Sequence, residues 1–167
     1  ENPTHLIHEQ ARIYDRIISG TDDPNSDNTK RRKLVLRYLA LFRRFGYAEP
    51  IIAEARSIAA IIQKDNPAIT WSDFQEIIKE LRNMRILQGE YSLYITPEIL
   101  HINFWSEWWD TYGAGFRLAQ FLPNEPENQA LRACFYEMFK YAAESRVASA
   151  IVRRLLGPAG PFHTDEE

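Results

Sequence analysis

The fold is decided by residues 70–97, which read TWSDFQEIIKELRNMRILQGEYSLYITP. Thr70, followed three residues later by Asp73, forms a variant of the capping box that opens a helix. The apolar residues after it recur at helical spacing as far as about Ile86, so we expect a helix with one buried stripe. That stripe comprises Phe74, Ile77, Ile78, Leu81 and Met84.

Beyond this helix the period of the apolar residues changes from helical to two. Residues 86–90 and 91–95 are predicted to form two short strands, and Gly89 lies at or near their turn. Thr96 and Pro97 then suit the N-cap and the first position of another helix. The stretch therefore predicts a helix, a β-hairpin and a closing helix.

Two further helices are expected before this stretch. Residues 30–45 are apolar over most of a helical circumference, and Gly46 is expected to end that helix. Pro50 suits the first turn of the next helix, which stops at the Asn-Pro pair of residues 66–67. Three helices followed by a hairpin and a helix are the winged-helix order. The fold class expected is therefore mainly α with a small β-hairpin.

The segments on either side of the winged helix are also predicted to be helical. A helix over residues 6–18 precedes a polar loop, and later helices are expected near 116–122, 126–143 and 146–156. The last helices resemble the start of a helical array. We divide the chain into an N-terminal helix and loop (1–28), a winged-helix domain (29–113) and a C-terminal helical segment (114–167).

Composition indicates a folded chain in a reducing compartment. Hydrophobic residues make up 45% and charged residues 26% of the 167, which is close to the globular norm. The single cysteine, Cys134, lies in an apolar run that is typical of a small buried side chain. No stretch has the length of a membrane span or the pattern of a signal peptide. We expect a cytoplasmic protein, and the absence of an initiator methionine suggests an excised fragment.

Charge is distributed unevenly along the chain. The net charge is −3, yet residues 30–44 contain seven basic residues and no acid. This basic patch comprises Lys30, Arg31, Arg32, Lys33, Arg37, Arg43 and Arg44. It begins at a helix N-terminus, where the macrodipole disfavours cations, so it could serve a phosphate, an RNA backbone or an acidic partner. The interpretation we favour is a solvated face paired with the acids of residues 22–27.

The third helix and the hairpin supply no net cation. Residues 70–113 hold three basic and seven acidic residues, and the exposed positions of the third helix carry two of each sign. Phosphate binding grows with the number of cations that a protein supplies. DNA binding through this helix is therefore disfavoured.

The helix after the hairpin carries a cluster of tryptophans at Trp105, Trp108 and Trp109. These three cannot all face one side of a helix, so some must meet the C-terminal helices or a partner chain. Internal packing is the interpretation we favour, and a partner surface is the alternative.

No pattern predicts catalysis or metal binding. The chain lacks a phosphate-binding GxxxxGK[ST] loop, a GxSxG nucleophile motif and an HExxH zinc motif. His5 and His8 share one helix face, but no further ligand lies at metal spacing, so we expect no metal site. His101 is expected to be buried and hydrogen-bonded. We expect no enzymatic activity and no cofactor in this chain.

Residues 33–47, 71–89 and 94–97 resemble the winged-helix region that follows the nucleotide-binding module in large signalling P-loop ATPases of the STAND type. The resemblance covers about Leu34 to Gly113, and the helical remainder is similar to the helical region that commonly follows. It implies that the ATP site lies upstream. It also implies that the winged helix clamps or releases the ATPase module, while the helices beyond it pass on or receive a ligand signal.

In that family a histidine just after the hairpin, within a Met-His-Asp motif, touches the nucleotide phosphate. Here residues 95–97 read Ile-Thr-Pro, so histidine and aspartate are absent at the matching positions. His101, several residues later, is the remaining candidate for such a nucleotide sensor.

We therefore expect a non-catalytic regulatory segment of a multidomain signalling ATPase that acts by intramolecular domain contact. Its partner would be the upstream ATPase module or another protein. A nucleic-acid-binding winged helix that uses the basic patch is the alternative. A homodimerising scaffold built on the three tryptophans is the second alternative.

Overall fold

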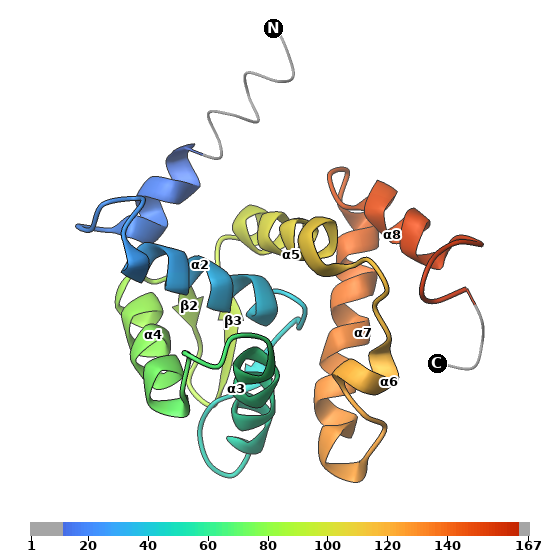
Figure 1. Ribbon diagram of the computed structural model, residues 1–167, viewed down its shortest axis with the longest axis horizontal. Helices are drawn as coiled ribbons and strands as arrows, with labels where there is room; N and C mark the ends of the chain where they lie inside the picture. Colours follow the sequence, from blue (N-terminus) through green and yellow to red (C-terminus); the bar gives the residue numbers. More distant parts are fainter. Residues whose placement is uncertain (1–11, 164–167) are drawn as a thin grey trace, which may run out of the picture.

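The computed structural model describes residues 12–163, which are mainly helical and include one small antiparallel sheet (Figure 1). Residues 12–19 form a helix that gives way to a turn at Gly20. The helix α2 follows over Asp27–Leu39, and the Ser26 hydroxyl caps it by accepting a hydrogen bond from the Thr29 N–H at 3.2 Å. Three more helices of the winged helix are α3 (Ala53–Asp65), α4 (Trp71–Asn83) and α5 (Glu98–Tyr112).

The sheet joins three short strands in the order β1-β3-β2. They are β1 (Phe45–Gly46), β2 (Leu87–Gln88) and β3 (Ser92–Ile95). The expected hairpin is confirmed, since β2 pairs antiparallel with β3 and Leu87 lies opposite Ile95. Gly89 adopts φ 119° in its turn, and a Cβ there would lie 1.9 Å from the Ser92 carbonyl oxygen. Only glycine fits this turn, so the tight wing depends on it.

The helix predicted over residues 30–45 is too long. It ends at Leu39, and Phe45 and Gly46 form β1, where Phe45 lies opposite Leu93 of β3. The prediction that Gly46 ends a helix is therefore wrong. Strand pairing buries Phe45 and Leu93 completely or nearly so, and this non-local gain outweighs the local helical pattern. Gly46 also lies so close to Ile51 that a Cβ would be 2.4 Å from the Ile51 carbonyl oxygen.

Two predicted helix starts also differ from the structure. Helix α3 begins at Ala53, after the turn that contains Pro50. The N-cap of α5 is Pro97, and the Thr96 hydroxyl instead donates to the Arg85 carbonyl oxygen at 2.9 Å. The capping box at the start of α4 is confirmed, because Thr70 and Asp73 exchange both of its hydrogen bonds. The Thr70 side chain thus caps α4, whereas the Thr96 side chain links the start of α5 to the segment after α4.

The C-terminal helices share the core of the winged helix. They are α6 (Leu118–Phe121), a 3₁₀ turn η1 (Pro126–Asn128), α7 (Gln129–Glu144) and α8 (Ser149–Leu156). In Figure 1 the winged-helix elements and α6–α8 form two halves, and α5 lies between them at the top of the view. One hydrophobic cluster extends from Ile18 to Leu155. The last helices are therefore packed onto the winged helix through α5.

Candidate functional site

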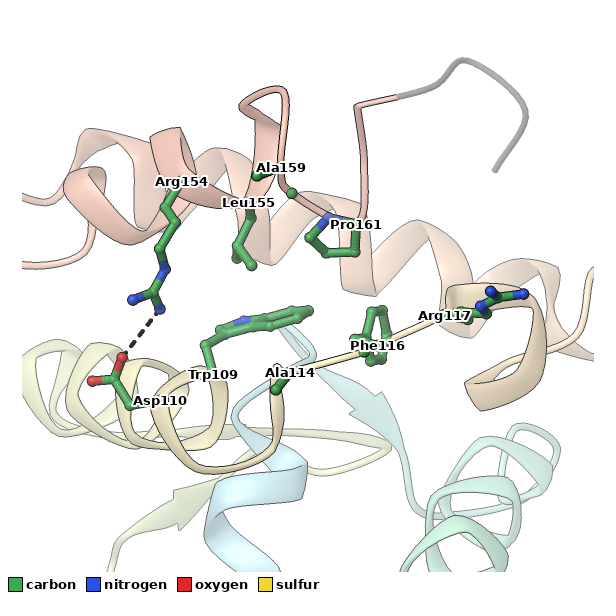
Figure 2. A pocket seen from close by; sticks show the side chains of 12 residues that line it. Trp109, Asp110, Ala114, Phe116, Arg117, Arg154, Leu155, Ala159 and Pro161 are labelled. Atoms are coloured by element: carbon green, nitrogen blue, oxygen red, sulfur yellow. Dashed lines mark hydrogen bonds and ion pairs between the residues drawn. The ribbon is translucent and has the colours of Figure 1, made fainter.

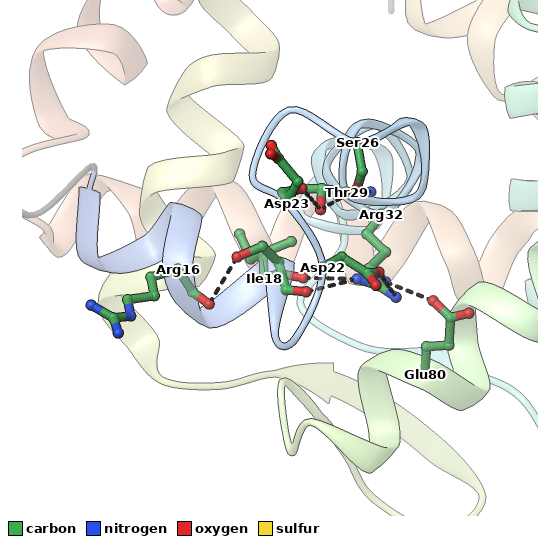
Figure 3. A network of polar contacts seen from close by, with 9 residues as sticks. Arg16, Ile18, Asp22, Asp23, Ser26, Thr29, Arg32 and Glu80 are labelled. Atoms are coloured by element: carbon green, nitrogen blue, oxygen red, sulfur yellow. Dashed lines mark hydrogen bonds and ion pairs between the residues drawn. The ribbon is translucent and has the colours of Figure 1, made fainter.

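Most cations of the basic patch form ion pairs with acids of the same chain, and Arg32 is the clearest example (Figure 3). Its side chain is 7% exposed, and its Nε donates to Glu80 Oε2 of α4 at 2.6 Å. Its Nη2 lies 2.8 Å from Asp22 Oδ2. Its Nη1 donates to the carbonyl oxygens of Ile18 and Ser19 at 3.3 and 3.2 Å. Arg32 thus pairs with two acids and caps the C-terminal end of the helix over residues 12–19.

The other cations of α2 are also engaged. Each of them faces a carboxylate. In three cases the carboxylate belongs to another helix, and in the fourth it lies in α2 itself. The pairs are Arg31 with Asp73 at 2.7 Å, Lys33 with Asp15, Arg37 with Glu107 at 2.9 Å, and Lys30 with Asp27 at 3.9 Å. The hydrogen bonds from Thr70 and the pairing with Arg31 lower the pKa of Asp73 to about 2. This carboxylate is therefore ionised at neutral pH.

The two arginines at the end of the patch lie apart from the ion pairs of α2. The guanidinium carbon of Arg43 lies 3.9 Å from the centre of the Tyr141 ring on α7, a cation–π contact. Arg44 is exposed on the turn that precedes β1. Five of the seven cations of residues 30–44 thus face carboxylates of the same chain, and nucleic-acid binding by the patch stays a prediction. The interpretation as a face paired with acids is confirmed in the case of Asp22 and Asp27.

Pairing also changes the balance of charge on α4. Because Arg31 and Arg32 neutralise Asp73 and Glu80, these two acids no longer offset the cations of this face. The charges left on α4 and the wing are three cations and two acids, and each is exposed: Lys79, Arg82 and Arg85 with Glu76 and Glu90. A surplus of one positive charge remains, which is far fewer than the roughly six to ten phosphate contacts of a tight DNA-binding protein.

His101 is buried between α5 and the end of α2. It is 0% exposed, and its Nε2 lies 3.1 Å from the carbonyl oxygen of Ala40. A carbonyl can only accept, so Nε2 carries the hydrogen. Burial, together with the smaller effect of the Arg43 charge, lowers the pKa of His101 to about 4, although the hydrogen bond to Ala40 opposes this shift. The expectation of a buried, hydrogen-bonded histidine is confirmed. The ring has no exposed surface through which to touch a nucleotide, and its role as a nucleotide sensor stays a prediction.

This histidine predicts a pH-dependent stability. Its pKa of about 4 in the folded state lies below the ordinary value of about 6.5 in the unfolded state, so protonation favours unfolding as the pH falls from about 6.5 towards 4. Between about pH 7.5 and pH 5 we expect His101 to remove about 2 kcal/mol of stability. Urea unfolding of the wild type and of His101→Gln at both pH values measures this. The variant should lose less stability over the interval, and parallel losses would contradict the assignment.

The three tryptophans of α5 lie in the interior. Trp105, Trp108 and Trp109 are 0%, 3% and 2% exposed. Their Nε1 atoms have no hydrogen-bond acceptor among the described residues, so ring packing holds them in place. The prediction of internal packing against the C-terminal helices is confirmed. Their side chains leave almost no exposed area for a partner, and dimerisation of the chain stays a prediction.

A cleft opens where α5 meets the C-terminal helices (Figure 2). It has a volume of about 450 Å³ and lies between the end of α5, the loop over residues 113–117 and α8. Trp109 and Phe116 form its floor, and Leu155 and Pro161 line the opposite wall. Arg154 Nη2 lies 3.1 Å from Asp110 Oδ1 across its mouth. No sequence pattern indicates this cleft, because its residues come from two segments, 109–117 and 154–161, that lie far apart along the chain.

Metal and membrane sites receive no support from the described residues. Within residues 12–163, no group of three or more histidine, cysteine or carboxylate side chains is arranged to hold a metal ion. His5 and His8 lie outside this range. Cys134 is buried, and burial raises the pKa of its thiol. None of the helices within residues 12–163 combines the length and apolar character needed to cross a bilayer.

Comparison of the chain with models of protein families, with curated proteins and with solved structures found no match.

Proposed function

We propose that the chain is a non-catalytic regulatory segment of a multidomain signalling ATPase in the cytoplasm, and that it acts by contact with the ATPase module. The observation that carries the proposal is a winged helix whose α2 cations are taken up by internal ion pairs. Such a fold has the shape of a nucleic-acid-binding winged helix, but few of its α2 cations are unpaired. We therefore favour contact with another protein surface.

Charge supports this choice over nucleic-acid binding. Duplex binding releases counterions in proportion to the free cations at the interface. The three nitrogens of the Arg32 guanidinium all face acceptors, and the Nε of Arg37 donates to Glu107 at 2.9 Å. The face of α4 and the wing adds a surplus of only one cation. The internal pairing of the α2 cations therefore supports domain contact over the nucleic-acid alternative.

An exposed apolar face supports contact with a neighbouring domain. Ile13 and Ile17 lie one turn apart on the helix over residues 12–19, and they are 57% and 41% exposed. Residues four apart share a helix face. Arg32 attaches this helix to α4, so a domain that binds the isoleucines contacts a part of the winged helix. We assign Ile13 and Ile17 to the contact with the ATPase module.

Calorimetric titration of this chain against the ATPase module of the same polypeptide tests the proposal. We expect saturable binding that differs between the ATP-bound and ADP-bound module. The double variant Ile13→Ser, Ile17→Ser should weaken it about tenfold or more. Val147→Ser, at a 64% exposed apolar residue near α8, is the matched control and should bind like the wild type.

Two results would contradict the proposal. The first is the absence of heat exchange in every nucleotide state. The second is a fluorescence-anisotropy titration in which a DNA duplex binds with an affinity that falls steeply with salt, as it does for interfaces that neutralise many phosphates. That second result would restore the nucleic-acid alternative.

A further inference from the structure

The cleft beside α8 has a rigid aromatic floor. The rings of Trp109 and Phe116 lie 4.9 Å apart at an angle of 77°, and both are at most 8% exposed. Phe135 and Phe162 support them from α7 and from the chain after α8. Figure 2 shows the Trp109 ring lying between the Arg154–Asp110 pair and Phe116. A floor held by other rings needs little ordering when a ligand binds, which favours affinity.

The mouth of the cleft favours a negative ligand. Among the residues that line it, Arg117 and Arg154 are cationic and Asp110 is anionic, so one positive charge is in surplus. The side chains of Arg154 and Asp110 are 61% and 62% exposed. An exposed ion pair of this kind contributes about 0–1 kcal/mol, so a ligand carboxylate can replace Asp110 at little cost. A guanidinium offers two parallel donors that match a carboxylate.

Its size and composition suit a small molecule. A volume of about 450 Å³ lies within the range of about 300–1,000 Å³ that small-molecule sites occupy. Such sites combine apolar walls with a few polar groups that set the orientation. Here Trp109, Phe116 and Leu155 supply the walls, and Arg154 supplies the orienting charge.

We propose that this cleft binds a small carboxylate with a flat apolar body. The body lies in the cleft against the exposed edges of its apolar lining, and the carboxylate pairs with Arg154 in place of Asp110. The site joins α5 to α8, so an occupant bridges the winged helix and the C-terminal helices. The inference is independent of the contact proposed for Ile13 and Ile17, and the two are tested by separate measurements.

Three isosteric probes separate the contributions of charge and apolar body: 3-phenylpropionate, 3-phenylpropan-1-ol and 3-phenylpropylamine. Each is titrated into the isotopically labelled chain, and the amide and indole signals are followed by NMR. We expect the acid to bind several-fold more tightly than the amine, because Arg154 attracts a carboxylate and repels an ammonium group. The shifts should concentrate at residues 109–117 and 154–161.

Three exposed substitutions then test the role of Arg154. Arg154→Gln should weaken the acid several-fold, to about the affinity of the alcohol, and leave the alcohol unchanged. Asp110→Asn removes the competing carboxylate and should tighten the acid. Arg153→Gln is the matched control, because Arg153 is exposed on the same helix and does not line the cleft.

The proposal fails if the three probes bind equally, or if none binds at about 10 mM, where a weak site of 1 mM affinity would be filled. Equal weakening of the acid by Arg153→Gln and Arg154→Gln would also overturn it, since this would indicate general attraction to a basic surface. All three substitutions alter exposed side chains, so each variant is expected to fold.

Discussion

Replacing Arg32 with methionine is expected to lower the free energy of unfolding by about 3 kcal/mol, because breaking a buried, hydrogen-bonded charge cluster removes several contacts at once. The guanidinium joins the helix over residues 12–19, the loop that contains Asp22, and α4. Its loss leaves Glu80 and Asp22 without their cation. Those carboxylates are 42% and 33% exposed, so water solvates them in part. This solvation keeps the expected loss at the lower end of the range for buried pairs.

The matched control is Arg31→Met. Arg31 is the preceding residue of the same helix, but its side chain is 38% exposed and it pairs with one partner, Asp73. We expect the control to cost less than about 1 kcal/mol. Denaturant unfolding measures both values. Hydrogen exchange should also become faster over residues 12–19 in the Arg32 variant only. Equal losses in the two variants would show that Arg32 has no special structural role.

Replacing Trp109 with alanine is expected to cost about 4 kcal/mol, because it removes a large buried ring and leaves a cavity. Trp109 is 2% exposed and packs against rings of α5, of the loop before α6, of α7 and of the chain after α8. Its ring neighbours are Trp105, Trp108, Phe116, Phe135, Phe139 and Phe162. The loss should therefore loosen the attachment of α7 and α8 as well as the local packing.

Trp71→Ala provides the comparison within the same residue type. Trp71 is only partly buried, stacks on Phe74 and lies 4.8 Å from the Arg56 guanidinium carbon. Less area returns to water when it is truncated, so we expect about 2 kcal/mol or less. Thermal or denaturant unfolding ranks the two variants. A cost for Trp109→Ala no larger than that for Trp71→Ala would contradict the central place of Trp109 in the core.

These two residues attach the flanking segments to the winged helix by different physics. Arg32 holds the N-terminal helix through ion pairs and carbonyl contacts, whereas Trp109 holds the C-terminal helices through ring packing. Salt screens charges that are partly exposed, but it leaves buried aromatic contacts intact. The N-terminal attachment is therefore the one that ionic strength can weaken.

Much of the winged helix could be predicted from local pattern. The helix α4 and the wing were located because a capping box, a helical stripe and a change of period follow one another within 28 residues. The strand β1 could not be located in this way. Phe45 and Gly46 continue the apolar run of α2, and they become a strand only because β3, nearly 50 residues later, pairs with them. Continuous apolar runs leave helix and strand unresolved.

The candidate sites were harder to predict than the fold. A run of cations in the sequence looks like a surface, but its partners Glu80 and Glu107 come from helices 48 and 70 positions away. His101 could be predicted to be buried, because it lies one turn into an apolar helix. The cleft beside α8 has no sequence signal, because the pairing of Asp110 with Arg154 spans 44 positions.

The order of residues was sufficient to establish helix periods, caps and the turn at Gly89, since these depend on neighbours within a few positions. Folding decided which charges stay free, where β1 forms and how the tryptophans are covered. Each of these outcomes is a balance between distant groups. Their energies depend on separation and burial in space, which the spacing of residues along the chain does not encode.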